Sequence, residues 1–264
     1  MSPLKRVGLA LSGGAALGAA HIGVLEVLED HGLRPCCLAG TSAGSAVGAA
    51  YCAGLSLARI REVATDLQWG KLGRVVLPRQ GFFDGSRLEE YLIGLIGDLT
   101  FDQLQIPLAV AAADILSDEL VIIREGRLAR AVRASCAAPA AFTPVEYEGR
   151  LLVDGGLINN LPVSAVREMG AEYVIAVDLS APLVANRRPP KTMLEMLLVS
   201  FVTLMRNTRR EAELADVVIW PDVGEFSPVD LSNVPILIER GRQAAEAALP
   251  RILADLHMEG NLVG

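Results

Sequence analysis

The stretch LAGTSAGSAVGAAYCAG, residues Leu38–Gly54, places a serine between two glycines at the G-x-S-x-G spacing, with Gly40, Ser42 and Gly44 at the fixed positions. The apolar residues before the motif are typical of a strand, and the small residues after it are typical of a helix. A sharp strand-to-helix turn exposes the residue at its tip. The stretch therefore predicts an α/β fold with Ser42 as a candidate nucleophile. Serine is also favoured at helix N-termini, so a structural cap is the alternative.

Outward from this stretch, apolar runs of strand length alternate with segments of helical periodicity. We expect strands at Val7–Leu11, Cys36–Leu38, Pro107–Ala113, Glu119–Arg124, Tyr173–Leu179 and Val217–Trp220. We expect helices at Ala16–Asp30, Ser42–Ala53, Leu57–Leu67, Ser86–Ile96, Arg127–Ser135, Leu161–Met169, Thr192–Leu214 and Pro235–Leu256. The alternation predicts one domain over residues 1–264, a three-layer α/β/α sandwich with a central, mostly parallel sheet.

Composition and charge narrow the classes of function. Of the 264 residues 52% are hydrophobic but only 5% are aromatic, which indicates an aliphatic core. The formal net charge of −7 argues against nucleic-acid binding as the main activity, because attraction to phosphates needs a basic surface. The same charge weakens electrostatic docking on anionic membranes.

Four cysteines include no C-x-x-C pair, so we expect reduced thiols and no metal site. The apolar N-terminus is interrupted by Ser12-Gly13-Gly14 and continues into a helical pattern, which favours a first strand and loop over a cleaved signal. No window offers the roughly 18 uncharged apolar residues of a membrane span. We therefore expect a cytoplasmic protein.

A serine nucleophile needs a base, and the sequence holds only three histidines. His257 is the only histidine after Ser42 and lies near the C-terminus, where a base is not expected. We expect His21 to pack behind the glycine loop that precedes it. A carboxylate in a dry pocket can serve instead, because poor solvation raises its basicity. Asp154 follows an apolar run and precedes two glycines, so it is the leading candidate, with a hairpin-turn aspartate as the alternative.

The segment SGGAALG, residues Ser12–Gly18, predicts a glycine loop between a strand and a helix. Backbone N–H groups at such a loop can point into an oxyanion hole or cradle a phosphate. The glycine spacing is not the G-x-G-x-x-G of dinucleotide-binding proteins, and no ribose-binding strand follows Asp30. An oxyanion hole is therefore favoured over a nucleotide site.

Taken together and in this order, three segments resemble the patatin-like phospholipase family, specifically its compact bacterial members. They are LALSGGAALGAAHIGVLEVLE, LAGTSAGSAVGAAYCAG and RASCAAPAAFTPVEYEGRLLVDGGLINNLPV, within a motif core of about residues 6–178. The resemblance implies hydrolysis of lipid acyl esters through an acyl-serine intermediate, without a metal or cofactor. It implies a dyad of Ser42 as nucleophile and Asp154 as base. It also implies an oxyanion hole at Gly13 and Gly14, with motif support from Gly18, Gly40, Gly44, Gly155 and Gly156.

One position departs from the family pattern. The family's loop commonly carries an arginine where this chain has Leu17, and the change removes a cation without removing backbone donors. Loss of one oxyanion donor typically costs about 3–4 kcal/mol of transition-state stabilisation. The departure leaves a second hypothesis open, a weakly active or non-catalytic acyl-binding or regulatory protein on the same fold.

Two further segments concern partners and access. Residues 192–205 are apolar on more than one helical face, which predicts either core packing or contact with a membrane or a second copy. Peripheral membrane contact and a homo-oligomer are both open on this pattern. The connector WGKLGRVVLPRQGFFDGSR, residues 69–87, is rich in glycine and proline and is interpreted as a loop or a lid over a site.

Overall fold

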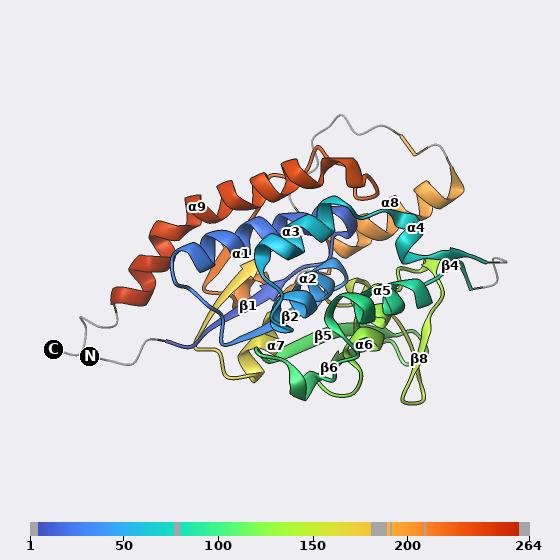
Figure 1. The fold of residues 1–264 in the computed structure, drawn as a ribbon, viewed down its shortest axis with the longest axis horizontal. Helices are drawn as coiled ribbons and strands as arrows, with labels where there is room; N and C mark the ends of the chain where they lie inside the picture. Colours follow the sequence, from blue (N-terminus) through green and yellow to red (C-terminus); the bar gives the residue numbers. More distant parts are fainter. Residues whose placement is uncertain (1–4, 77–79, 181–188, 191, 209, 259–264) are drawn as a thin grey trace.

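The computed structural model of the chain describes residues 5–76, 80–180, 189–190, 192–208 and 210–258 (Figure 1). A central sheet has the strand order β11-β10-β1-β2-β5-β9-β8, and β6 pairs with β5 beside this path. Its strands are β1 Val7–Leu11, β2 Cys37–Thr41, β5 Leu108–Asp114, β6 Glu119–Ile123, β8 Val145–Tyr147, β9 Arg150–Asp154, β10 Tyr173–Val177 and β11 Val217–Ile219.

The five strands from β11 to β5 run parallel, whereas β6, β9 and β8 form antiparallel pairs. The sheet is therefore mostly parallel, as the sequence predicts. The carboxyl ends of parallel strands meet at one edge, which is where loops carry binding and catalytic groups in open α/β sheets. The glycine loop follows β1 and the G-x-S-x-G motif follows β2 at this edge.

Helices cover both faces of the sheet, which confirms the three-layer prediction (Figure 1). The longer helices are α1 Ala20–Asp30, α2 Ala43–Cys52, α3 Leu57–Thr65, α5 Ser86–Ile96, α6 Leu128–Ser135, α8 Met193–Met205 and α9 Val234–Met258. The short ones are α4 Trp69–Leu72 and α7 Val163–Glu168, with 3-10 turns η1 Ala15–Ala19, η2 Phe101–Gln103, η3 Gly155–Leu157, η4 Arg210–Leu214 and η5 Leu231–Asn233.

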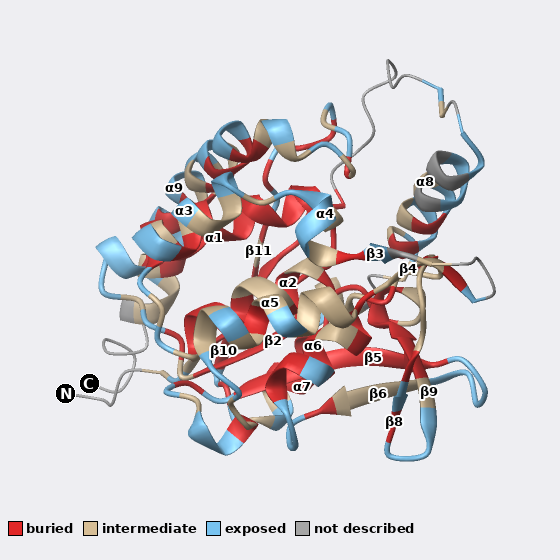
Figure 2. Ribbon diagram, turned by 45° about the vertical axis from the view of Figure 1, so that its right-hand side comes forward, coloured by how far each residue is buried: buried red, intermediate tan, exposed pale blue. Residues whose placement is uncertain are grey.

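The two faces of the sheet differ in side-chain size. Alternation along β1 sends Leu9 and Leu11 into the cluster shared with α1, α2, α6 and α9, and sends Ala10 into the smaller cluster beneath α7. Buried residues accordingly follow the strands of the sheet (Figure 2). The large aliphatic core therefore lies on the face that carries α2.

The connector of residues 69–87 is more ordered than a loop. Its described residues contain α4 and two strands, β3 Arg74–Val75 and β4 Gly81–Asp84, and β4 pairs with β7 Ala140–Phe142. The rings of Phe83 and Phe142 lie 5.9 Å apart between centroids. The expected loop is therefore a small second sheet, fixed by a tilted aromatic pair.

The expectation of one helix over residues 192–214 is wrong. Helix α8 ends at Met205, and the next helical segment is η4. The hydroxyl of Thr208 donates to the carbonyl oxygens of Met205 and Gly156, at 2.9 and 2.7 Å. Threonine side chains compete with helical backbone bonds in this way, so the chain turns at Thr208 and joins η3. Within the described part of the chain, every helix is too short or too polar to cross a bilayer.

Candidate active site

Ser42 stands at the turn between β2 and α2, as the G-x-S-x-G motif predicts. Its backbone has φ 50° and ψ −123°, a left-handed conformation that non-glycine residues rarely adopt. Both flanking positions must be glycine, because neighbouring backbone atoms leave no room for a Cβ there. A Cβ on Gly44 would lie 2.4 Å from the carbonyl oxygen of Leu11, and one on Gly40 would lie 2.6 Å from the backbone of Gly44. Strained backbone of this kind is concentrated at functional sites.

Asp154 occupies the last position of β9 and is buried. Its carboxylate accepts a hydrogen bond from the Gly156 N–H at 2.9 Å, and its interaction with the Ser42 hydroxyl lowers the pKa of the carboxyl. The hairpin-turn alternative is wrong, because the turn between β8 and β9 falls at residues 148–149. A Cβ on Gly155 would lie 2.4 Å from the Ala111 carbonyl oxygen, so only glycine lets the chain pass β5 at this point.

Burial raises the pKa of Asp154 to about 7, and the interactions of the carboxyl with the Ser42 hydroxyl and the Gly156 N–H offset part of that rise. A base works best when its pKa lies near the working pH, since it is then both ionised and able to hold a proton. A carboxyl with a pKa of about 7 can take up and release a proton near neutral pH.

The glycine loop lies against Ser42. A Cβ on Gly13 would lie 3.1 Å from the Cβ of Ser42, and one on Gly18 would lie 2.4 Å from that of Ala43. The N–H of Gly13 donates to Asn160, whose Oδ1 and backbone oxygen lie at 3.1 and 3.3 Å. The N–H of Gly14 donates to no acceptor among the described residues. Of the two glycines expected as oxyanion donors, Gly14 has the available N–H.

The position where the family carries arginine belongs to the core in this chain. The side chain of Leu17 is only 1% exposed and packs in the larger hydrophobic cluster. An arginine at this position, with the same backbone, would bury a charge.

His21 takes no part in this arrangement. His21 is buried behind the glycine loop, as expected, and its Nε2 lies 2.8 Å from the Ser12 carbonyl oxygen. Burial lowers the pKa of His21 to about 4, so the ring is neutral at physiological pH. The side chain of His257 lies outside the described residues.

Ser42 opens onto an apolar cavity of about 460 Å³. Helix α2 contributes small side chains to its wall, including Ala46 and Ala50, and larger ones come from α3, α4 and α5. At the same cavity the Trp69 indole N–H donates to the Val229 carbonyl oxygen at 2.8 Å, which joins α4 to the segment before α9. Apolar walls with few polar groups suit a hydrocarbon ligand.

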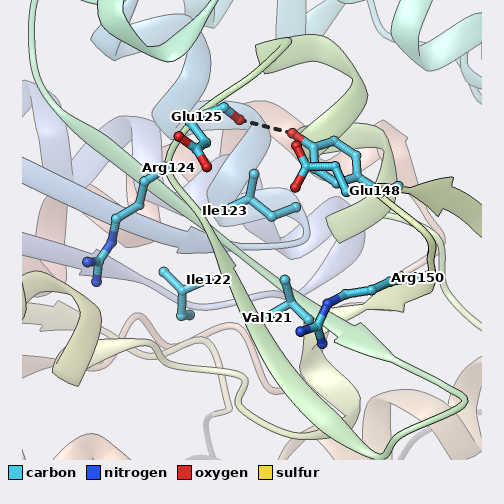
Figure 3. Close-up of a pocket in the computed structure, with 8 residues that line it drawn as sticks. Val121, Ile122, Ile123, Arg124, Glu125, Glu148 and Arg150 are labelled. Carbon is cyan, nitrogen blue, oxygen red and sulfur yellow. Dashed lines mark hydrogen bonds between the residues drawn. The ribbon is translucent and has the colours of Figure 1, made fainter.

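A second hollow, of about 220 Å³, lies between β6 and the β8–β9 hairpin (Figure 3). Tyr147 donates to the Glu125 carbonyl oxygen at 2.9 Å, and Arg150 pairs with Glu119 at 3.0 Å. Its lining also includes Arg124, which is paired with Glu168. Both arginines of this hollow are therefore paired with carboxylates outside its lining, and the lining holds no serine, cysteine or histidine.

The four cysteines are free thiols, and the described residues contain no cluster of three or more histidine, cysteine, aspartate or glutamate side chains suited to a metal ion. Cys136 contacts Ser42, and burial together with Asp154 raises its pKa to about 12. The thiol is therefore protonated at neutral pH and does not compete with Ser42 as a nucleophile.

Sequence reasoning missed Ser135, Cys136 and Asn160 as neighbours of the site. All three fall in or beside the third resembling segment, but their residue types carry no chemical signal of their own. Only their contacts with Ser42 and Gly13 reveal them.

Comparison with known proteins identifies the family. Residues 9–167 match the family described as patatin-like phospholipase. An uncharacterized NTE family protein of Mycobacterium tuberculosis is 30% identical over 93% of this chain and 46% of its own length. Patatin-like phospholipase domain-containing protein 6 of Mus musculus is 35% identical over 66% of this chain and 14% of its own length. The chain thus spans about half or less of these curated relatives.

Solved structures show the same fold at low sequence identity. VipD from Legionella pneumophila superposes with a TM-score of 0.64 at 15% identity, over 94% of this chain and 67% of that one. The type III effector protein ExoU gives a TM-score of 0.52 at 16% identity, over 94% and 53%. With the family match over more than half of its length, this chain belongs to the patatin-like phospholipase family.

Proposed function

We propose that this protein is a serine acyl-ester hydrolase of lipid esters, phospholipid, lysophospholipid or related, which works through a Ser42–Asp154 dyad. The observation that carries the proposal is the interaction of the Ser42 hydroxyl with the buried carboxyl of Asp154, at the wall of an apolar cavity. Membership of the family supports the same activity.

In the first step the Oγ of Ser42 attacks the ester carbonyl carbon while Asp154 takes the hydroxyl proton. The negative charge that develops on the carbonyl oxygen is stabilised by the N–H of Gly14 and by the N-terminal end of α2, which begins directly after Ser42. The N–H of Gly13 joins them only if it leaves Asn160. No metal ion takes part in this scheme.

The tetrahedral intermediate then collapses. Its carbon–oxygen bond to the leaving alcohol breaks, and Asp154 returns the proton to that alcohol. Water attacks the acyl-serine in the second half-reaction, with Asp154 again accepting the proton and then restoring it to Ser42. The pKa of about 7 suits Asp154 to both transfers.

The cavity supplies the site for the acyl chain. An apolar cavity of about 150 Å³ is enough to bind benzene, so a cavity of about 460 Å³ has room for a much longer hydrocarbon. The wall along α2 presents alanines and no charge, which favours an unbranched hydrocarbon. We therefore infer that the substrate carries a long acyl chain.

The alternative is an acyl-binding or regulatory protein that turns over slowly or not at all. The occupied N–H of Gly13 and the apolar Leu17 favour it, since both reduce the stabilisation of an oxyanion. Such a protein would fill the same cavity with an acyl group without forming an acyl-serine.

A fluorophosphonate probe separates the two functions, because it reacts only with an activated serine. We expect stoichiometric labelling of the wild type and none of Ser42→Ala. Asp154→Asn and Ser42→Ala should each lose hydrolysis of short p-nitrophenyl esters by at least a thousandfold. An unlabelled but folded wild type that still binds long-chain fatty acid would establish the alternative, and near wild-type turnover by Asp154→Asn would reject the dyad.

We also propose that the outer face of α8 meets the lipid that supplies the substrate. Met193, Met196, Leu197 and Leu204 on this helix are exposed, whereas a Cβ on Gly13 would lie 2.6 Å from the Cε of the buried Met205. The apolar face therefore lies on the helix that adjoins the glycine loop. Because the net charge is −7, a zwitterionic surface suits it better than an anionic one. This contact would make the protein peripheral to the membrane, and we propose a cytoplasmic location for it.

A further inference from the structure

The backbone N–H of Ser42 has an unusual partner. Its left-handed φ of 50° places Ser42 outside α2, and the N–H donates to the hydroxyl oxygen of Ser135 at 2.8 Å. Ser135 is the last residue of α6 and lies 93 positions away in the sequence. Both residues are buried, so water does not replace this contact.

The Ser135 hydroxyl also makes a second hydrogen bond, this time as the donor. It donates to the carbonyl oxygen of Ala111 on β5 at 2.6 Å. That oxygen is the atom against which Gly155 packs, directly after Asp154. The side chain of Ser135 therefore connects the backbone of Ser42 to β5, the strand that pairs with β9, on which Asp154 lies.

The residues after Ser135 hold the other half of the site. The carbonyl oxygen of Ala137 accepts the backbone N–H of Asp154 at 3.0 Å. The end of α6 thus holds the backbone N–H of Ser42 through a side chain and that of Asp154 through the main chain. The position of this end of α6 therefore sets the distance between the backbones of Ser42 and Asp154.

From these contacts we propose that Ser135 is a positioning residue for the hydrolysis, which holds Ser42 in its strained conformation and in register with Asp154. The proposal rests on the function proposed above. A strained residue persists only where its surroundings determine it, and among the described residues Ser135 provides the one acceptor for this N–H. Ser135 lies behind the turn and is absent from the cavity wall, so it affects the chemical step and not substrate binding.

Ser45 offers a matched control. Its side chain is also a fully buried serine hydroxyl bonded to the backbone of Ser42, with its oxygen 2.6 Å from the carbonyl oxygen. That carbonyl, however, also accepts the N–H groups of Ser45 and Ala46. Removing the Ser45 hydroxyl leaves the carbonyl satisfied, whereas removing the Ser135 hydroxyl leaves the N–H of Ser42 without an acceptor.

The experiment compares Ser135→Ala, Ser135→Cys and Ser45→Ala with the wild type. A misplacement of about 1 Å can cost two orders of magnitude in rate, so Ser135→Ala should lower kcat and the fluorophosphonate labelling rate by 10- to 100-fold, with KM changed less than twofold. Ser135→Cys keeps a weaker donor and acceptor and should show a smaller loss of the same kind. Ser45→Ala should stay within threefold. Urea unfolding confirms that each variant is folded.

The outcomes separate the two proposals. A wild type that reacts with the probe, together with a folded Ser135→Ala that reacts as fast, rejects the role of Ser135 and leaves the proposed function standing. A loss confined to KM also rejects it. If Ser135→Ala does not fold, the test passes to Ser135→Cys. A kcat of Ser135→Cys equal to that of the wild type then rejects the positioning role of Ser135. A wild type that never reacts rejects both proposals.

Discussion

Replacing Asp154 by asparagine should abolish activity and at the same time stabilise the fold. Burial holds the pKa of this carboxyl at about 7, against 3.8 in an unfolded chain. A raised pKa means that the folded protein binds the proton more tightly than the unfolded chain. The contribution of Asp154 to stability is therefore greatest below pH 4 and is lost as pH rises to 7.

The size of the effect follows from the two pKa values. Between 3.8 and about 7, each pH unit lowers the free energy of unfolding by about 1.4 kcal/mol, for a total of about 4 kcal/mol. Asparagine has nearly the same shape, keeps an oxygen for the Gly156 N–H and never ionises. We therefore expect Asp154→Asn to be more stable than the wild type by up to about 4 kcal/mol at pH 8, a rise in Tm of roughly 10 °C.

The assay is urea or thermal unfolding of both proteins at pH 8 and pH 5. The advantage of the variant should fall to about 2 kcal/mol at pH 5, where the folded wild type has regained its proton. All other titratable groups are the same in both proteins, so the change in the difference reports Asp154. An advantage that is equal at the two pH values, or a variant that is less stable at pH 8, would refute the reasoning.

Three further predictions follow from the site. With Asp154 as the base, kcat/KM for a neutral short-chain ester should fall about tenfold per pH unit below 7, and a flat profile down to pH 5 would exclude it. Ala50 lies about 12 Å along α2 from Ser42, so Ala50→Phe should cut hydrolysis of palmitoyl esters at least tenfold while sparing butyryl esters; equal losses on both would contradict the cavity assignment. Met196→Glu should weaken flotation with phosphatidylcholine vesicles severalfold. Leu214→Glu, at an equally exposed leucine before the amino end of β11, should not, and equal effects would reject the docking face.

The sequence was sufficient to predict the structure wherever the conformation of a segment depended on that segment alone. The strand Val7–Leu11 and the helix Ser86–Ile96 have the predicted bounds, because each is a short periodic run ended by glycine or a polar residue. The turn at Ser42 was predictable for a similar reason, since Gly40 and Gly44 are needed by the local path of the chain. Asp154 required the family resemblance, because Asp-Gly alone is equally typical of a hairpin.

What the sequence could not provide are contacts between distant segments. The break after Met205 depends on a hydrogen bond from Thr208 to Gly156, which no helical pattern reveals. The partner of the Gly13 N–H is an asparagine 147 positions away. The cavity arises where α2, α3, α4 and α5 leave space between them, and their sequences indicate only that these helices are apolar on one side.

The span of the chain that forms the site has a consequence for folding kinetics. The hydroxyl of Ser135 joins Ser42 to Ala111, and Asp154 lies on β9, which pairs with β5. The proposed nucleophile and base are thus brought together although they lie more than a hundred residues apart in the sequence. Such non-local pairings form late, because the chain must first lose loop entropy. Recovery of esterase activity should therefore lag the recovery of helical circular dichroism during refolding. Turnover would then serve as a time-resolved reporter of the final docking step.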